Sequence, residues 1–123
     1  MWAWTSELVD KVAPETILLM DGMPRRVSEA EVLEEALGFF GRADAAIVYL
    51  DVSRQWATER LIGRGRADDL ERADIDARMD WFDREVLPVI DFYRAHPRHK
   101  FSDIRGEQPI EAVAADIAAA LGL

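Results

Sequence analysis

Short apolar runs alternate with helical patterns along this chain, and that alternation restricts its fold more than any other feature. Ile17 to Met20 and Ala45 to Leu50 are continuous apolar runs, each followed directly by an aspartate, and Phe101 to Ile104 is a weaker third run. Runs of this kind are typical of strands covered on both faces of a sheet. The segments between them carry apolar residues at helical spacing. The sequence therefore predicts an α/β fold with a parallel sheet flanked by helices.

Capping and helix-breaking residues predict where the helices begin and end. Ser28 and Glu31 form a capping-box pattern, and Ser53 can cap the helix that follows the second apolar run. A long helical pattern begins at Asp74, and Pro88 is expected to kink it or to start a second segment. Pro109 suits the first turn of a last helix.

Composition limits the class of protein. The chain has 123 residues, which is enough for one domain with a single core. It has no cysteine, no signal-like N-terminus and no apolar run near membrane-spanning length, so we expect a cytoplasmic protein with no membrane partner. Its 24 acidic residues outnumber its 15 basic ones, which argues against a nucleic-acid partner.

The basic residues are unusual in kind and position. All but Lys11 and Lys100 are arginine, and several arginines fall between Arg54 and Arg78. A guanidinium group forks onto phosphate or carboxylate oxygens. An acidic chain with a local arginine cluster therefore indicates a small anionic ligand.

The loop after the first apolar run is the best-defined candidate site. Asp21, Gly22, Pro24 and Arg25 follow Ile17 to Met20 directly. In open α/β sheets, ligands bind beyond the carboxyl ends of the strands. Glycine allows close backbone approach, proline stiffens the turn, and Arg25 supplies a cation.

Four segments of the chain together resemble the adenylate kinases and related nucleoside monophosphate kinases. "LLMDGMPRR" is similar to the family's "DGFPRT" segment, and "TERLIGRGRADD" (Thr58 to Asp69) to its nucleotide-binding helix and a short lid, here about residues 63–72. "DAR" with "LPVIDFYR" resembles the helix after the lid, and "IRGEQPIEAV" the last loop and helix. The resemblance implies a transferase of nucleotide biosynthesis that moves a phosphoryl group from ATP to AMP or a related nucleoside monophosphate, with Mg²⁺ as cofactor.

The resemblance also implies roles for individual residues. Arg25 would grip the acceptor phosphate, Arg60 would stack over the donor base, and Asp21 would hold a water on the Mg²⁺ ion. The acceptor nucleotide would be bound by Gly22, Met23, Pro24, Arg25, Glu29, Arg66 and Arg78. ATP would be bound by Arg60, Arg64 and Gln108. The catalytic residues, which stabilise charge on the transferring group, would be Arg64, Arg66 and Arg78.

Glu29 stands where the family carries a glutamine that reads the acceptor base. An ionised glutamate only accepts hydrogen bonds, so adenine preference is expected to weaken. An acid in the first turn of a helix explains Glu29 equally well.

Several of these residues also have a purely structural interpretation. Arg60 and Arg64 could pair with Glu59 and Asp68 on a solvated helix face. Asp21 could brace its turn, and Arg25 could lie in a solvated turn. We expect the tryptophans, Trp56 among them, to serve packing and His96 and His99 to lie at the surface.

One part of the family's pattern is absent from this sequence. The family begins with a strand, the pattern Gly-x-x-x-x-Gly-Lys and the helix that it opens, and this chain has no Gly-Lys pair. We therefore expect an N-terminally incomplete single domain over residues 1–123. Met1 could be an internal start, the chain could be a fragment, or a partner could supply the rest.

The absent strand has a defined place in the family's sheet. It would lie between the strands expected at Ile17 to Met20 and at Ala45 to Leu50. A second chain or self-association could complete the sheet there, and the isolated chain is expected to be inactive. The competing interpretation is a non-catalytic nucleotide-binding or assembly module.

Overall fold

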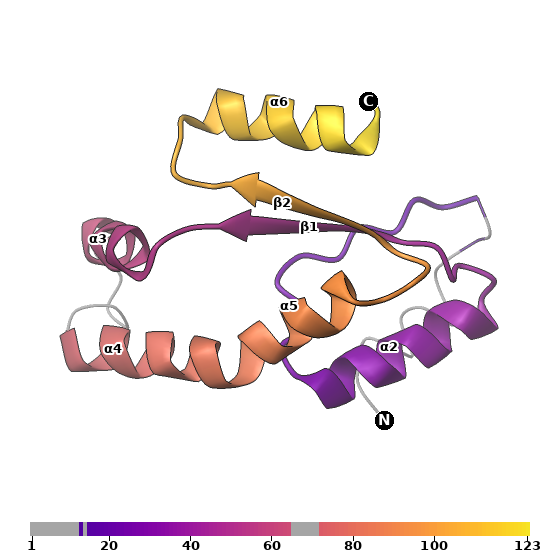
Figure 1. The fold of residues 1–123 in the computed structure, drawn as a ribbon, viewed down its shortest axis with the longest axis horizontal. Helices are drawn as coiled ribbons and strands as arrows, with labels where there is room; N and C mark the ends of the chain where they lie inside the picture. Colours follow the sequence, from indigo (N-terminus) through magenta and orange to yellow (C-terminus); the bar gives the residue numbers. More distant parts are fainter. Residues whose placement is uncertain (1–12, 14, 65–71) are drawn as a thin grey trace.

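The computed structural model describes residues 13, 15–64 and 72–123. These residues form helices around one small parallel sheet (Figure 1). The elements are, in order, α2 (Val27–Phe39), β1 (Ala46–Asp51), α3 (Arg54–Arg64), α4 (Arg72–Trp81), the π-helix η2 (Phe82–Val86), α5 (Leu87–Arg94), β2 (Lys100–Arg105) and α6 (Ile110–Leu121). The predicted α/β fold with a parallel sheet is confirmed.

The sheet consists of β1 and β2 alone among the described residues. The strands run parallel, with Ala46 opposite Lys100 and Asp51 opposite Arg105. Because parallel strands end at the same edge of a sheet, the loops that follow Asp51 and Arg105 lie next to each other. Both strands fall where the apolar runs predicted them.

The first of the three predicted strands, Ile17 to Met20, is not formed, so this prediction is wrong. These residues belong to no strand, although they alternate between exposed and half-buried positions as a strand would. Ile17 and Leu19 are 93% and 89% exposed. A strand exists only when its backbone groups pair with a neighbour, and no described strand lies beside this segment.

Two predicted helix starts also change. Helix α2 begins at Val27, with Arg26 at its N-cap and no hydrogen bond from a capping side chain. The predicted Ser28–Glu31 capping box is therefore wrong. Pro109 was predicted to lie in the first turn of the last helix, but it is the N-cap of α6, which begins at Ile110. The cap at Ser53 is confirmed, because its Oγ accepts a hydrogen bond from the Trp56 backbone N–H at 3.2 Å.

The long helical pattern changes type just before Pro88. The π-helix Phe82–Val86 separates α4 from α5, and Pro88 stands in the first turn of α5. Proline has no N–H to donate and its ring crowds the preceding turn, so a widened turn relieves the clash. The predicted break at Pro88 is confirmed in this form.

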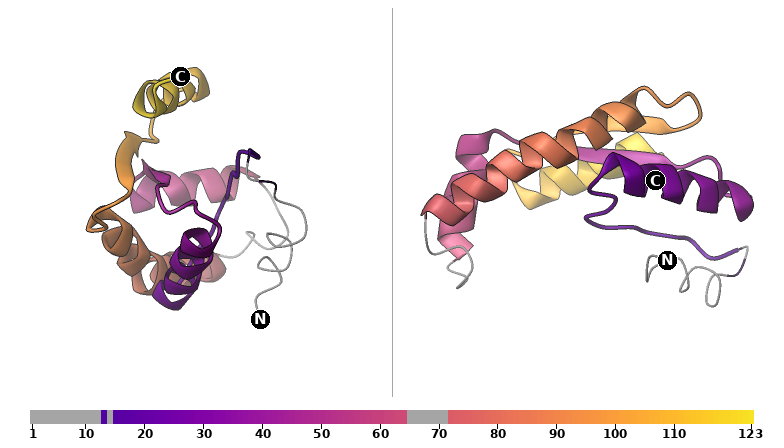
Figure 2. Two further views of the ribbon diagram at one scale, coloured as in Figure 1. Left: turned by 90° about the vertical axis from the view of Figure 1, so that its right-hand side faces the viewer. Right: turned by 90° about the horizontal axis from the view of Figure 1, so that it is seen from below.

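The helices lie on two sides of the strand pair. Figures 1 and 2 show α6 beside β2, while α2 and the run from α4 to α5 lie on the other side of the strands. A buried cluster of Ala30, Val89 and Tyr93 joins α2 to α5, and Ile47 and Phe101 of the strands pack against it. No helix in the described ranges is long and apolar enough to cross a membrane.

Gly106 allows the two strand ends to meet. Its backbone N–H donates to the Asp51 carbonyl at 2.8 Å. A Cβ at this position would lie 2.5 Å from Val52 Cγ1 and 3.3 Å from the Asp51 carbonyl oxygen. The glycine is therefore required by the close approach of the loop after β2 to the end of β1.

We predict that Gly106→Ala destabilises the chain by about 1–3 kcal/mol, because the added methyl group overpacks this contact. Urea unfolding followed by circular dichroism measures the change. Gly38→Ala is the matched control, since nothing lies within 4 Å of its Cβ and the residue is inside α2. Alanine there should stabilise by about 0.5–1 kcal/mol. Equal stability of the two variants would contradict the prediction.

Candidate functional site

The loops after β1 and β2 are tied to each other at the carboxyl edge of the sheet. The Glu107 Oε1 atom accepts a hydrogen bond from the Ser53 backbone N–H at 2.7 Å, across 54 residues of sequence. The Gln108 side chain donates from Nε2 to Asp116 Oδ2 of α6 at 2.6 Å. The first bond fixes the loop after β2 against the start of α3, and the second fixes the same loop against α6. Nothing in the sequence had marked Glu107 as important.

The loop Asp21 to Arg25 has a glycine-dependent shape. Gly22 has φ +68°, a conformation that favours glycine, and Asp21 is exposed. Arg25 folds back so that its Nε donates to the Gly22 carbonyl at 2.6 Å. Arg26 instead pairs with Glu85 of η2 at 3.5 Å. This loop thus holds one exposed carboxylate and one exposed guanidinium close together.

Glu29 braces that loop. Its Oε2 accepts a hydrogen bond from the Arg25 backbone N–H at 2.8 Å, and it lies in the first turn of α2. An acid at this position satisfies a backbone donor at the helix start and interacts favourably with the helix dipole. The structural interpretation of Glu29 therefore has direct support, and its role in base choice stays a prediction.

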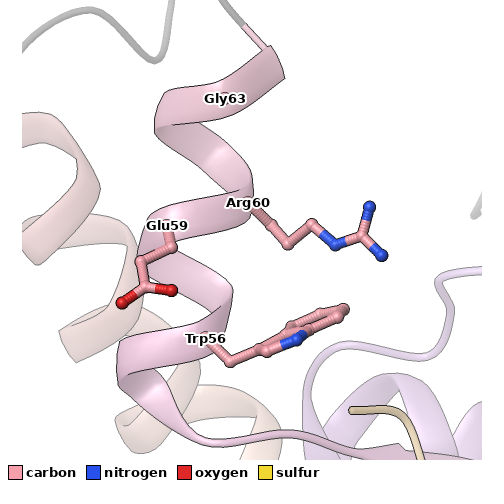
Figure 3. Close-up of a pocket in the computed structure, with 4 residues that line it drawn as sticks. All are labelled: Trp56, Glu59, Arg60 and Gly63. Atoms are coloured by element: carbon pink, nitrogen blue, oxygen red, sulfur yellow. The ribbon is translucent and has the colours of Figure 1, made fainter. Parts of the chain in front are cut away.

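Trp56 and Arg60 form a cation–π pair on α3. The Arg60 guanidinium carbon lies 4.6 Å from the indole centroid, and Figure 3 shows both side chains on one side of the helix with Glu59 on the other. Together with Glu59 and Gly63 they line a pocket of about 350 Å³. The alternative in which Arg60 pairs with Glu59 is wrong, because Glu59 accepts a hydrogen bond from Gln55 at 3.0 Å instead.

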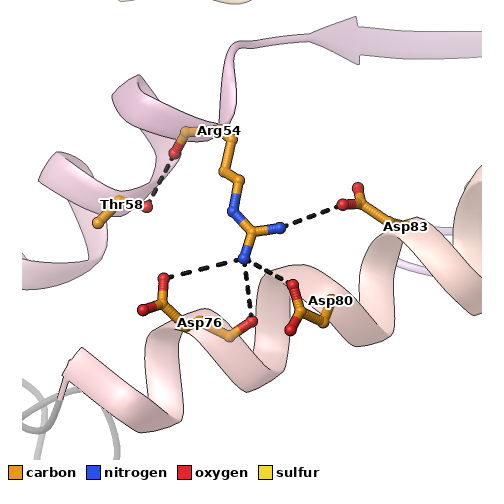
Figure 4. A network of polar contacts seen from close by, with 5 residues as sticks. All are labelled: Arg54, Thr58, Asp76, Asp80 and Asp83. Atoms are coloured by element: carbon orange, nitrogen blue, oxygen red, sulfur yellow. Dashed lines mark hydrogen bonds and ion pairs between the residues drawn. The ribbon is translucent and has the colours of Figure 1, made fainter.

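Arg54 belongs to the structural part of the arginine cluster. Its guanidinium reaches Asp80 at 2.7 Å, Asp83 at 3.1 Å and Asp76 at 3.8 Å (Figure 4). The hydrogen bond to Asp80 is the main reason that the pKa of Arg54 is raised. Arg54 thus joins the start of α3 to α4 and η2. The prediction that the arginine cluster binds an anionic ligand therefore does not apply to Arg54.

An apolar groove separates the segment Ile17 to Met20 from β1. Its volume is about 490 Å³, and its walls come from that segment, from Met23 and Pro24, from α2 and α5, and from the β1 residues Ala46 to Tyr49. The side of β1 away from β2 has no strand partner among the described residues. Within the described part of the chain, this strand edge beside an apolar groove is a surface that a further strand could pair with.

A buried histidine–carboxylate network lies behind this groove. The prediction that His96 and His99 lie at the surface is wrong, because their side chains are only 16% and 0% exposed. His99 Nε2 lies 2.7 Å from Glu34 Oε1, and His96 stacks on His99 with centroids 4.1 Å apart. Burial first, and the neighbouring Glu34 carboxylate second, raise the pKa of Tyr93.

This network has the composition of a metal site, since its three ligand atoms lie within 4.8 Å of one another. The tautomer of His99 argues against that use. Its Nδ1 accepts a hydrogen bond from the Ala45 backbone N–H at 3.2 Å, so the ring proton sits on Nε2 and donates to Glu34. A zinc ligand through Nε2 needs the opposite arrangement. We assign the network a structural role.

The remaining predicted site residues are only partly described. Arg78 is exposed on α4, and Arg64 is the last residue of α3. Arg66 and most of the expected lid, residues 63–72, lie outside the described residues. Among the described contacts, no hydrogen bond or ion pair joins Arg25, Arg60 and Gln108 to one another. These three candidates lie on different parts of the chain, with Arg25 before α2, Arg60 on α3 and Gln108 before α6.

Comparison with known proteins decides the family. The chain is 35% identical over 105 residues to an adenylate kinase of Synechococcus sp. (strain JA-2-3B'a(2-13)), covering 82% of this chain and 53% of that protein. It is 36% identical over 104 residues to adenylate kinase 1 of Nostoc sp. (strain PCC 7120), covering 85% and 55%. The chain belongs to the adenylate kinase family.

A third adenylate kinase, from Corynebacterium glutamicum (strain R), is 36% identical over 117 residues, covering 95% of this chain and 61% of that protein. The chain thus spans between 53% and 61% of the length of these adenylate kinases. No model of a known protein family matches it. The resemblance drawn from the four sequence segments is confirmed.

The Glu107 contact gives a pH-dependent prediction. Hydrogen bonds from Ser53, from its hydroxyl first and its backbone second, lower the pKa of Glu107 below its ordinary value of 4.5. A lowered pKa means that the carboxylate stabilises the fold above pH 4.5, and that this contribution is lost as the pH falls through the folded-state pKa. We predict that the stability difference between wild type and Glu107→Gln shrinks below pH 4.5.

Urea unfolding at a series of pH values measures this difference. Glu31→Gln, at an exposed position of α2, controls for the loss of one negative charge. A difference that stays constant down to acid pH would show that the Ser53–Glu107 contact contributes nothing through the charge on Glu107.

Proposed function

We propose that this chain is the acceptor-loop and donor-base part of a nucleoside monophosphate kinase, which transfers a phosphoryl group from ATP to AMP or a related nucleoside monophosphate. The observation that carries the proposal is the loop Asp21 to Arg25 at the end of the open groove, in a chain about 35% identical to adenylate kinases. Because the chain spans little more than half of those proteins, we propose that it is inactive alone.

The acceptor side would use the loop after Ile17 to Met20. Arg25 is exposed, and the bond that holds it uses only Nε, which leaves the terminal nitrogens of the fork for a phosphate. Gly22 lets the backbone approach the ligand, and Met23 and Pro24 form the wall between loop and groove. Glu29 would hold this loop in place through the Arg25 backbone.

The donor side would use α3 and the loop after β2. Arg60 presents a cation beside a pocket, and Arg64 follows it one helical turn later. Gln108 is bonded to Asp116 of α6, and its neighbour Glu107 is bonded to Ser53 just before α3. Phosphoryl transfer depends mainly on positioning and on stabilising charge that spreads over the equatorial oxygens. We propose that Arg64, Arg66 and Arg78 supply that charge as the catalytic residues.

Asp21 fits the expected Mg²⁺ site. It is an exposed carboxylate at the end of the Ile17 to Met20 segment, and Mg²⁺ bound with nucleotides keeps several waters and needs only one or two protein carboxylates. When bound, the ion would neutralise charge on the donor phosphates. Asp21 would hold one of its waters and so orient it.

We propose that the groove beside β1 takes a parallel, apolar strand that carries a phosphate-binding loop. The groove is walled mainly by apolar side chains, one side of it is a strand edge with no partner among the described residues, and the related adenylate kinases are longer than this chain. A strand in this position would give β1 its missing hydrogen-bond partners and lead its loop toward Asp21 and α3.

We predict that the purified chain converts no ATP and AMP to ADP, because nothing in its sequence cradles the β- and γ-phosphates. A polypeptide with a strand, Gly-x-x-x-x-Gly-Lys and the helix that it opens should restore turnover when mixed with the chain. The same polypeptide with its lysine replaced by alanine is the matched control, and it should bind without restoring turnover. A coupled ADP assay measures both.

Steady ADP formation by the chain alone, abolished by Arg66→Ala, would contradict the prediction that the isolated chain is inactive. A mixture that binds tightly but never turns over would favour the second candidate, a non-catalytic nucleotide-binding or assembly module. That candidate rests on the missing Gly-Lys pair. A cytoplasmic location stays a prediction.

A further inference from the structure

We propose that Trp56 is a positioning residue for the donor base, because its indole holds the Arg60 guanidinium beside the pocket. This inference rests on the proposed donor site at Arg60. It adds a residue that sequence analysis had expected to serve packing alone. In this arrangement the indole would hold the guanidinium in place, and a flat face of the guanidinium would stack on the nucleotide base.

The geometry of the pair supports this role. Trp56 and Arg60 are four residues apart on α3, so they lie on one face of the helix. The guanidinium carbon is 4.6 Å from the indole centroid, which is within the range of a cation–π contact. Figure 3 shows the planes of the guanidinium and the indole steeply inclined to each other, so the indole restrains the cation without covering its flat faces.

The surroundings of Arg60 leave it available for a ligand. Glu59, its sequence neighbour, points to the opposite side of the helix (Figure 3), where Gln55 donates a hydrogen bond to it. Among the described residues Arg60 makes no ion pair. Arg54, by contrast, reaches three aspartates, so the two arginines of α3 differ in what surrounds them.

The adjoining pocket has room for a base. Its volume is about 350 Å³, at the lower end of the range for small-molecule sites. Gly63, which lines the same pocket, has nothing within 4 Å of its Cβ position, so the wall at that point is open. An exposed arginine loses much rotamer freedom when it binds a ligand, and a preformed contact with the indole removes part of that cost.

The contact itself can be tested without ligand. In the wild-type chain, the Arg60 Cδ protons should show an upfield ring-current shift in the NMR spectrum. Trp56→Leu should abolish that shift, and Trp56→Phe should keep part of it. An unshifted Arg60 in the wild type would overturn the proposal.

Binding then tests the role, with ATP and inorganic tripolyphosphate as probes in equilibrium dialysis. We expect Trp56→Leu to weaken ATP binding about threefold to tenfold and to leave tripolyphosphate binding unchanged. Trp56→Phe should stay within about twofold of wild type, since a phenyl ring still supports a cation. Trp81→Leu in α4 is the matched control and should change neither ligand.

The outcomes separate this proposal from the proposed function. Equal ATP binding by wild type and Trp56→Leu would overturn the role of Trp56 and leave the donor site in place. An equal loss for both ligands would mean that Trp56 acts only through the fold. If the wild-type chain bound no ATP, the donor site and the role of Trp56 would both be wrong.

Discussion

The parallel pairing of β1 with β2 is the interaction on which the rest of the structure depends. It brings the loops after Asp51 and Arg105 to one edge, where Gly106 and Glu107 bind the end of β1 and the start of α3. That contact sets the direction in which α3 leaves the sheet, and hence where Trp56 and Arg60 lie. Arg54 then joins α3 to α4 and η2.

The other side of β1 is as important as the paired one. There β1 has no strand partner among the described residues, and the groove between β1 and the segment Ile17 to Met20 has an apolar wall on each side. The described contacts that hold the loop with Asp21 and Arg25 are its own hydrogen bond and the one to Glu29 of α2. The donor and acceptor parts of the proposed site lie on separate elements, and no described hydrogen bond or ion pair joins Arg25 to Arg60.

Local signals in the sequence were enough for much of this fold. The apolar runs of β1 and β2, the cap at Ser53 and the break before Pro88 all depend on neighbouring residues. The prediction of a strand at Ile17 to Met20 failed because a strand needs a neighbouring strand to pair with, and a local sequence pattern does not show whether one is present. The buried Glu34–His99 contact joins residues 65 positions apart, so their polar neighbours in the sequence gave no sign of burial. The spacing of four residues between Trp56 and Arg60 on a predicted helix could have predicted their contact.

Amide hydrogen exchange, followed residue by residue by NMR, tests the central claim that the groove beside β1 is an open strand position. In the chain alone, the amides of Ile17 to Met20 should exchange rapidly at every protein concentration. Addition of the polypeptide that carries the strand and phosphate-binding loop should slow exchange in this segment and in β1 together. Slow exchange of Ile17 to Met20 in the chain alone, or no change when the polypeptide binds, would contradict the claim.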